Sequence, residues 1–190
     1  TGHVMLSGAS GMGKTTICLE ILRDSLAEGR PGIVLNDQTV ANATSIEEAI
    51  DIELRRYLPE LAHFSGATAL DFCSELDPFV VVVEDINRSE NTISLLNKLA
   101  SWALHEGGGK SPKWRLLCPI WPRFLAGLEK SNEVNKVGMI HFLGAYSESD
   151  AQKAVKLRSL ALGISQNDLA AAAIARSLGY DPLLIGLRLR

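Results

Sequence analysis

Gly8-Ala9-Ser10-Gly11-Met12-Gly13-Lys14-Thr15 is the stretch of sequence that decides the fold. It follows the apolar run His3 to Ser7 and leads into a helical pattern that begins at Lys14. Its glycines allow the backbone to bend until consecutive N–H groups face one anion, and the start of the helix adds a partial positive charge. A strand before it and a helix after it are the context that the Walker A pattern requires. The stretch therefore predicts a phosphate-binding loop; the alternative is a glycine-rich turn that binds no ligand.

The polar members of this loop have separate predicted tasks. Lys14 would reach the β- and γ-phosphates of ATP, and the Thr15 hydroxyl would be a ligand of Mg²⁺. Thr16 is included in the nucleotide-binding loop, although its hydroxyl is expected to help cap or pack the helix. The predicted nucleotide-binding residues of the loop are thus Gly8, Ala9, Ser10, Gly11, Met12, Gly13, Lys14, Thr15 and Thr16.

A second motif, Phe79-Val80-Val81-Val82-Val83-Glu84-Asp85, is an apolar run that ends in two acids. It predicts a fully buried strand that delivers both carboxylates to the carboxyl edge of the sheet, where open α/β sheets bind ligands. This is a Walker B pattern, in which one acid holds Mg²⁺ through water and the other orients or deprotonates the attacking water. Asp is commoner in the first position, so the division of tasks stays open. The interpretation favoured here places Glu84 near the metal and Asp85 near the water; the alternative is a strand that ends in two solvated acids.

Short apolar runs alternate with longer stretches of helical periodicity, which is typical of a parallel sheet covered by helices. The predicted strands are His3 to Ser7, Ile33 to Asn36, Phe79 to Val83, Trp114 to Cys118 and Gly138 to Leu143. The predicted helices between them are Lys14 to Glu28, Ile46 to Leu58, about Thr68 to Leu76, Asn91 to His105 and Arg123 to Lys130. The fold class is α/β, and a P-loop NTPase would have the strand order 5-1-4-3-2.

Beyond the fifth strand the pattern becomes entirely helical. Ser147 to Asp150 offers capping oxygens to one helix, Ser165 to Asp168 begins another, and Pro182 is placed to start a third. We predict a nucleotide-binding α/β domain at 1–144 and the start of a helical lid or switch subdomain at 145–190. The first and last residues fall close to apolar elements, so we expect the chain to be a segment of a longer protein.

In the strand order 5-1-4-3-2, the fourth strand lies between the first and the third, and its end would touch the γ-phosphate. Arg123, just beyond that strand, is a candidate sensor of the terminal phosphate, and a solvated surface arginine is an equal alternative. Asn87 and Arg88 follow the paired acids and would face the nucleotide or a neighbouring subunit, or more simply form a turn.

Composition excludes several other classes of protein. A net charge of -3 and a pI near 5.8 give no basic field for a phosphate backbone, so no direct nucleic-acid binding is expected. No apolar run approaches the roughly 20 residues that span a bilayer. The 3 cysteines lack metal-ligand spacing and indicate a reducing, cytoplasmic location, and the 4 scattered histidines, among them His63, indicate neither a metal site nor a nucleophile.

The chain resembles the STAND class of signalling ATPases, which includes the NACHT and NB-ARC families. The resemblance lies in the order of its motifs: Gly8 to Thr15, Val81 to Asp85, the strand and exit from Trp114 to Arg123, and, after helices, Gly179-Tyr180-Asp181-Pro182. The resemblance covers nearly the whole chain. It implies slow ATP hydrolysis, a switch from an ADP-bound monomer to an oligomer, and effector and sensor domains on the same longer chain. Some bacterial members act in antiviral defence. By this resemblance Pro182 would lie against the nucleotide, although the family's turn is Gly-x-Pro and this one is a residue longer.

Three other functions remain open. An AAA+ type motor or loader shares the same core and needs sensing arginines, for which Arg158 and Arg176 are available. A small-molecule kinase needs a lid rich in arginine, and the loop at Gly107 to Gly109 has only Lys110 beside it. A non-hydrolysing, ATP-dependent scaffold would explain the unusual order of Glu84 and Asp85.

Overall fold

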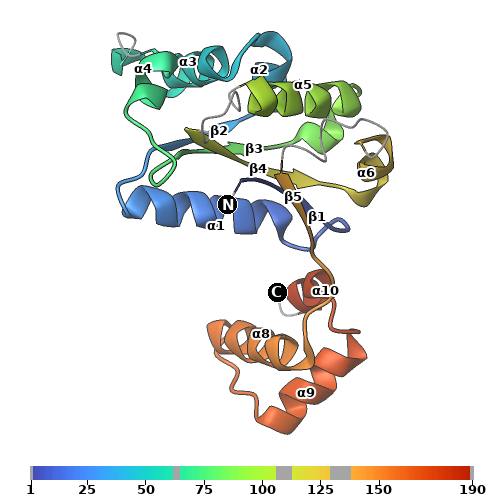
Figure 1. The fold of residues 1–190 in the computed structure, drawn as a ribbon. Helices are drawn as coiled ribbons and strands as arrows, with labels where there is room; N and C mark the ends of the chain where they lie inside the picture. Colours follow the sequence, from blue (N-terminus) through green and yellow to red (C-terminus); the bar gives the residue numbers. More distant parts are fainter. Residues whose placement is uncertain (1, 62–64, 106–112, 129–137, 189–190) are drawn as a thin grey trace. The chain divides into compact units, whose positions relative to one another are not determined.

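The computed structural model describes residues 2–61, 65–105, 113–128 and 138–188. The chain forms two compact units (Figure 1). The first, here called the sheet unit, comprises Thr1–Ser7 and Thr15–His141, and the second, the loop-and-helix unit, comprises Gly8–Lys14 and Phe142–Arg190. The predicted loop at 106–112, His63 and the end of the predicted helix Arg123 to Lys130 lie outside the described residues.

The sheet unit is built on a five-stranded sheet with the order β2-β3-β4-β1-β5. The strands are β1 (His3–Ser7), β2 (Gly32–Leu35), β3 (Phe79–Val83), β4 (Trp114–Ile120) and β5 (Gly138–Phe142). The registers of β1 with β4, β2 with β3 and β3 with β4 are parallel. This topology confirms the α/β class and the predicted order 5-1-4-3-2.

Register brings the ends of the key strands to one edge of the sheet. Ser7, the last residue of β1, is paired with Ile120, the last residue of β4. On the other side of β4, β3 is paired up to Val82, and every residue of β3 is buried. The strand leading into Gly8 and the strand leading into Glu84 therefore flank β4 and end at the same edge.

Helices cover both faces of this sheet. Helix α1 (Lys14–Ala27) lies on one face, and α2 (Asp37–Asn42), α3 (Ile46–Tyr57), α4 (Gly66–Asp71) and α5 (Thr92–His105) lie on the other (Figure 1). The short helix α6 (Pro122–Leu128) packs against α5, and the 3-10 turns η1 (Pro59–Leu61) and η2 (Ile86–Arg88) follow α3 and β3. The main hydrophobic core joins Val81 and Leu116 of the sheet to Ile50 of α3 and Leu96 of α5.

Two predicted boundaries were wrong in ways that have a physical cause. Strand β4 continues past Cys118 to Ile120, although Pro119 has no N–H to donate to a neighbouring strand. Because β4 is paired with β3 only as far as Leu117, no hydrogen bond between these two strands is lost at Pro119. Helix α4 is capped by Ser65 and ends at Asp71 instead of running from Thr68 to Leu76. Leu76, the predicted end of this helix, is 85% exposed. Helix α2 was missed because six residues are too short to show a period.

The later part of the loop-and-helix unit contains α8 (Glu148–Ala161), α9 (Asp168–Ser177) and α10 (Pro182–Arg188). Ser147 and Asn167 cap the first two helices, and Asp181 Oδ1 accepts from Leu183 N at the start of the third (2.7 Å). These helices share a small core of Ala151, Val155, Ala171, Ala175 and Ile185. The domain boundary predicted between residues 144 and 145 stays a prediction.

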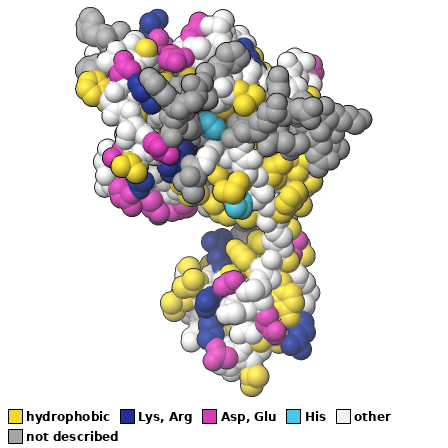
Figure 2. Space-filling model, viewed as in Figure 1, with side chains coloured by type: hydrophobic (Ala, Val, Ile, Leu, Met, Phe, Trp, Pro, Cys, Tyr) yellow, Lys and Arg dark blue, Asp and Glu magenta, His cyan; other side chains and the backbone are white. Residues whose placement is uncertain are grey.

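Two further observations concern the charge of the surface and the length of the helices. Figure 2 shows both acidic and basic side chains on the visible face of both units, in keeping with a net charge of -3. In the part of the chain that the structure describes, every helix is too short or too polar to cross a membrane.

His3, at the start of β1, is buried as a neutral ring. Its Nδ1 accepts a hydrogen bond from Leu116 N (3.1 Å), and the ring lies against Trp114 with centroids 4.6 Å apart. Burial, and to a smaller extent the positive charge of Arg115, lower the pKa of His3 from 6.5 to about 4. Between these values the unfolded chain binds a proton that the folded protein does not, so acidification favours unfolding.

We expect His3 alone to lower the free energy of unfolding by about 3 kcal/mol as the pH falls from 6.5 to about 4. The loss is absent above pH 6.5 and complete near pH 4. Urea denaturation at about pH 7 and about pH 4.5 should show a smaller loss for His3→Asn, which has no titrating ring. His141→Asn, at an exposed position in β5, is the control; equal losses in all three proteins would contradict the assignment.

Candidate nucleotide-binding site

Gly8–Lys14 forms a tight loop around the Lys14 ammonium. Lys14 Nζ donates to the carbonyl oxygens of Gly8 (2.8 Å) and Ala9 (2.7 Å), and the side chain is only 6% exposed. Burial lowers the pKa of Lys14, because it disfavours the charged form. The two carbonyls compensate that cost with charge-assisted hydrogen bonds, and a phosphate oxygen would compensate it more fully.

The glycines of the loop adopt backbone conformations that other residues avoid. Gly11 has φ 81° and Gly13 has φ 78°, both in the left-handed region. A Cβ at Gly8 would lie 2.9 Å from the Leu143 carbonyl oxygen, so only glycine fits there. Beside Gly13 no heavy atom lies within 4 Å of the corresponding position, among the described residues. The backbone is therefore open on the side of Gly13, as the approach of a phosphate requires.

Residues that could hold Mg²⁺ lie in the sheet unit. Thr15 and Thr16 are exposed in the first turn of α1, and Glu84 is half-buried directly after β3. One turn beyond Thr15, burial and secondly the charge of Glu84 raise the pKa of the Cys18 thiol to about 12. The charge of Glu84 therefore acts on a residue in the second turn of α1. An exposed hydroxyl and a nearby carboxylate are oxygen ligands of the kind that Mg²⁺ takes alongside phosphates.

Asp85 has surroundings unlike those of its neighbour. It adopts φ 56°, a left-handed conformation that aspartate tolerates better than most residues. Its side chain is 61% exposed, and Oδ1 lies 3.4 Å from Arg88 Nε. The backbone leaves the extended conformation at this residue, so the two acids do not simply alternate across a strand. Glu84 is thus associated with α1, and Asp85 with solvent and Arg88.

Asn87 connects the end of β3 to the end of β4. Its Nδ2 donates to the Pro119 carbonyl (2.7 Å), and its Oδ1 accepts from Trp121 N (2.8 Å). The 3-10 turn η2 contains Asn87 and Arg88, as the simpler sequence interpretation expected. The amide is committed to backbone groups, which favours a structural task over contact with a nucleotide. Sequence spacing gave no sign of this link, because its partners lie more than 30 residues away.

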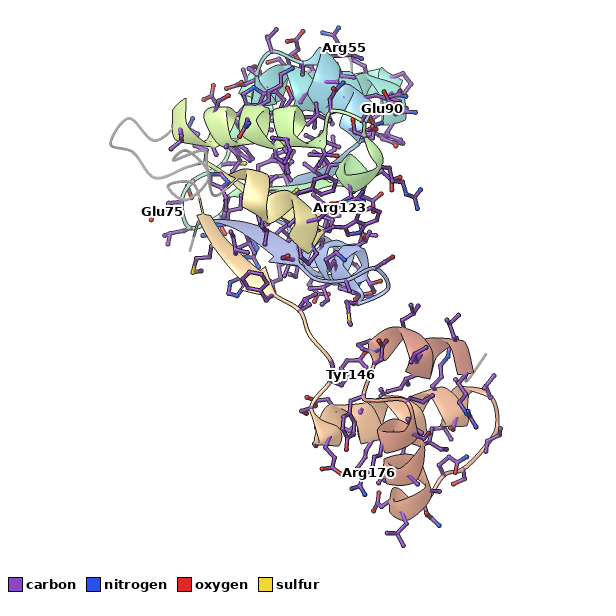
Figure 3. All side chains as sticks on the ribbon, turned by 90° about the vertical axis from the view of Figure 1, so that its right-hand side faces the viewer. Arg55, Glu75, Glu90, Arg123, Tyr146 and Arg176 are labelled. Carbon is purple, nitrogen blue, oxygen red and sulfur yellow. The ribbon has the colours of Figure 1, made fainter. Side chains whose placement is uncertain are left out.

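Arg123 lies in α6 just beyond β4 and is exposed (Figure 3). Its Cζ is 4.5 Å from the ring centroid of Trp121 and 4.7 Å from that of Phe124. The two rings are stacked at 6.3 Å with an interplanar angle of 12°. Each ring attracts the cation, so the guanidinium is oriented by aromatic contacts. The structure therefore holds Arg123 next to the end of β4, and its predicted sensing of phosphate stays a prediction.

A pocket of about 330 Å³ lies within the loop-and-helix unit. Its lining includes Gly11 of the loop, Tyr146, Arg158 of α8, and Pro182 and Leu183 of α10. Leu183 carbons lie 2.7 to 2.9 Å from the position of a Cβ on Gly11, so this glycine also permits close packing. The size suits a small molecule. Two sequence-predicted site residues, Gly11 and Pro182, thus line one pocket, whereas Tyr146 and Leu183 were not predicted.

A pre-formed metal centre would need several His, Cys, Asp or Glu side chains placed close together. Among the described residues, no group of three or more His, Cys, Asp and Glu side chains is placed to hold a metal ion. All three cysteines are free and buried. A magnesium ion bound together with a nucleotide needs only one or two protein oxygens, which Thr15 and Glu84 can supply.

Comparison with known proteins supports the fold. No family model matches the sequence, and no curated protein matches it. Among solved structures, the RuvB Holliday junction branch migration motor of Thermotoga maritima has 18% identity and a TM-score of 0.57, over 99% of this chain and 53% of that one. The Walker-type ATPase paby2304 of Pyrococcus abyssi has 14% identity and a TM-score of 0.61, over 96% of this chain and 60% of that one. The chain spans little more than half of these proteins, and it shares their fold, an α/β P-loop NTPase fold.

Proposed function

We propose that this chain binds ATP with Mg²⁺ through Gly8 to Thr15 and hydrolyses it slowly, as the nucleotide switch of a STAND-type signalling ATPase. The observation that carries the proposal is the Lys14 ammonium, buried in the loop after β1 and bonded to two carbonyl oxygens. A buried cation at the N-terminus of a helix, inside a loop of glycines with positive φ, is suited to clustered phosphate charge.

Binding would use groups that are already in place. Backbone N–H groups from Gly11 to Thr15 would donate to the phosphates, and Lys14 would exchange its carbonyl partners for phosphate oxygens. Thr15 Oγ1 and the Glu84 carboxylate would hold Mg²⁺, which neutralises charge on the β- and γ-phosphates when bound. The influence of the Glu84 charge on Cys18, one turn beyond Thr15, supports this assignment.

Hydrolysis would require a base for the attacking water. We assign this task to Asp85, whose carboxylate is exposed and close to Arg88. Water oxygen bonds to the γ-phosphorus, the bond from that phosphorus to the bridging oxygen of ADP breaks, and Asp85 accepts the proton of the water. Because Asp85 is largely exposed and paired with Arg88 at the surface, we expect slow turnover, in keeping with a regulatory enzyme.

The switch would lie in the loop-and-helix unit. Gly11 and Pro182 line one pocket, so a nucleotide in the loop would alter the surroundings of α10. A ligand shifts a conformational equilibrium only by the difference in its affinity for the two states. We propose that ADP and ATP differ in their contacts with this pocket. ATP-dependent self-assembly through the nucleotide domain, effector and sensor domains on the same longer chain and a role in antiviral defence rest on the STAND resemblance alone. A cytoplasmic location rests on the cysteines, which lack metal-ligand spacing.

The second candidate is an AAA+ type motor or loader, and one observation favours it. Arg158 of α8 lines the same pocket as Gly11 and Pro182, where a cation would be able to sense bound phosphate. In a motor, such an arginine contributes to hydrolysis. In the switch, contact between α10 and the nucleotide mainly determines how long ADP is retained.

Two substitutions separate these candidates. For a switch, we expect Pro182→Gly to weaken ADP binding about tenfold while Arg158→Gln changes turnover less than about threefold. For a motor, we expect Arg158→Gln to lower turnover at least about a hundredfold. Calorimetry with ADP and phosphate release with ATP measure the two effects. Lys153→Gln, at an exposed position on α8 where the side chain pairs with Asp150, is the control for lost charge; the motor pattern would overturn the switch proposal.

A further inference from the structure

A second pocket, of about 310 Å³, lies within the sheet unit beneath α1. Its floor consists of Val4, Val80 and Leu117, one residue from each of the adjacent strands β1, β3 and β4. Val4 and Leu117 are direct partners in the sheet. Helix α1 supplies the buried Ser25 and the partly exposed Ile21 on the opposite wall. Among the described residues, its lining shares no member with the candidate nucleotide site.

The charges around this pocket are only partly balanced. Arg30 lines it but forms an ion pair with Glu28, and the Asp24 carboxylate is 3.2 Å from Arg23. Arg115 is half-buried and donates to the Glu75 carbonyl oxygen (3.0 Å). In the described parts of the chain, Arg115 has no carboxylate partner. A guanidinium has five N–H donors, so a single bond to a carbonyl leaves most of its capacity unused.

An apolar floor beside one uncompensated cation is suited to a particular kind of ligand. Burying an apolar body against Val4, Val80 and Leu117 gains free energy in proportion to the area removed from water. A negatively charged head would form charge-assisted hydrogen bonds with Arg115. The volume lies at the lower end of the range for small-molecule sites.

We propose that this pocket is a second binding site, for a small amphipathic anion with one carboxylate or sulfonate head on an apolar body. Arg115 binds the head, and Val4, Val80 and Leu117 contact the body. The site is independent of ATP binding, because Val4 lies near the start of β1 and the nucleotide loop follows its end.

The test compares octanoate with octanamide, which has the same apolar chain and no charge. At about pH 7 octanoate is ionised, since carboxyl groups have a pKa near 4. Titration followed by NMR of labelled Val and Leu methyl groups should show shifts at Val4, Val80 and Leu117. Octanamide should bind about tenfold more weakly, as expected for loss of a hydrogen bond between charged groups.

Substitution then identifies the cation. Arg115→Gln should remove the preference for octanoate, whereas Arg55→Gln, at an exposed position on α3, should keep it (Figure 3). Lys14→Ala should leave octanoate binding unchanged, so failure at the ATP site would not affect this result. Equal binding of the two ligands to the native protein, methyl shifts confined to other residues, or a preference that survives Arg115→Gln would each overturn the proposal. The ligand comparison on the native protein decides the question even if Arg115→Gln does not fold.

Discussion

Replacing Lys14 with alanine is expected to abolish ATP binding or to weaken it at least about tenfold, by calorimetry in the presence of Mg²⁺. The ammonium is the only positive side chain of the loop Gly8 to Thr15, and phosphate groups would replace the carbonyl partners that it has at Gly8 and Ala9. Without it, only backbone dipoles and Mg²⁺ would compensate the phosphate charges.

The matched control for this substitution is Lys98→Ala. Lys98 also donates to a backbone carbonyl, that of Ala41 (2.8 Å), but lies in α5. Its removal should leave ATP affinity unchanged. Thermal unfolding of both variants must show that the fold is intact, because Lys14→Ala leaves two carbonyls without their donor. Unchanged affinity in a folded Lys14→Ala protein would remove the site assignment.

The second large effect concerns the paired acids. Asp85→Asn is expected to keep ATP affinity within about threefold and to slow phosphate release at least about a hundredfold, because an amide cannot accept the proton of the attacking water. Glu84→Gln should instead raise the Mg²⁺ concentration required for tight ATP binding, because a neutral amide is a weaker ligand of a hard cation. Binding isotherms at several Mg²⁺ concentrations and single-turnover phosphate release measure both.

The different surroundings of Glu84 and Asp85 are the reason for assigning metal binding to the first and proton acceptance to the second. Glu84 influences Cys18 in α1, whereas Asp85 contacts Arg88 and solvent. If only Glu84→Gln blocks hydrolysis while ATP binding is retained, the two tasks are reversed. If the native protein binds ATP but releases no phosphate, the scaffold interpretation is favoured. Asp24→Asn, at an exposed position on α1, controls for the loss of one surface charge.

The sequence predicted those features that depend on local pattern. The loop Gly8 to Thr15 and the buried run Phe79 to Val83 each contain their own signal, and the strand order follows from the class of fold that they indicate. Helix ends were less accurate where packing departs from hydrophobicity. The predicted helix Thr68 to Leu76 includes two large apolar residues, Phe72 and Leu76, yet these are 81% and 85% exposed beyond the end of α4.

Contacts between distant segments were not predictable from one sequence. The amide of Asn87 holds two backbone groups of the chain near Pro119, and no spacing rule connects them. The aromatic contacts of Arg123 depend on how α6 begins after β4. Likewise, Gly11 packs with Leu183 of the last helix, although the purpose of Gly11 in the motif is conformational freedom. Such contacts depend on how distant segments meet in the folded chain, whereas a motif can be recognised from neighbouring residues alone.

The most direct test of the account is the response of loop amides to a nucleotide. Amide NMR spectra would be recorded while Mg²⁺ and adenylyl imidodiphosphate, an ATP analogue that resists hydrolysis, are added to the native protein. We expect the largest shifts at the N–H groups of Gly11, Gly13, Lys14 and Thr15, because they would donate to phosphate oxygens. Loop amides that stay unchanged while the nucleotide binds elsewhere, or no binding at all, would contradict the account.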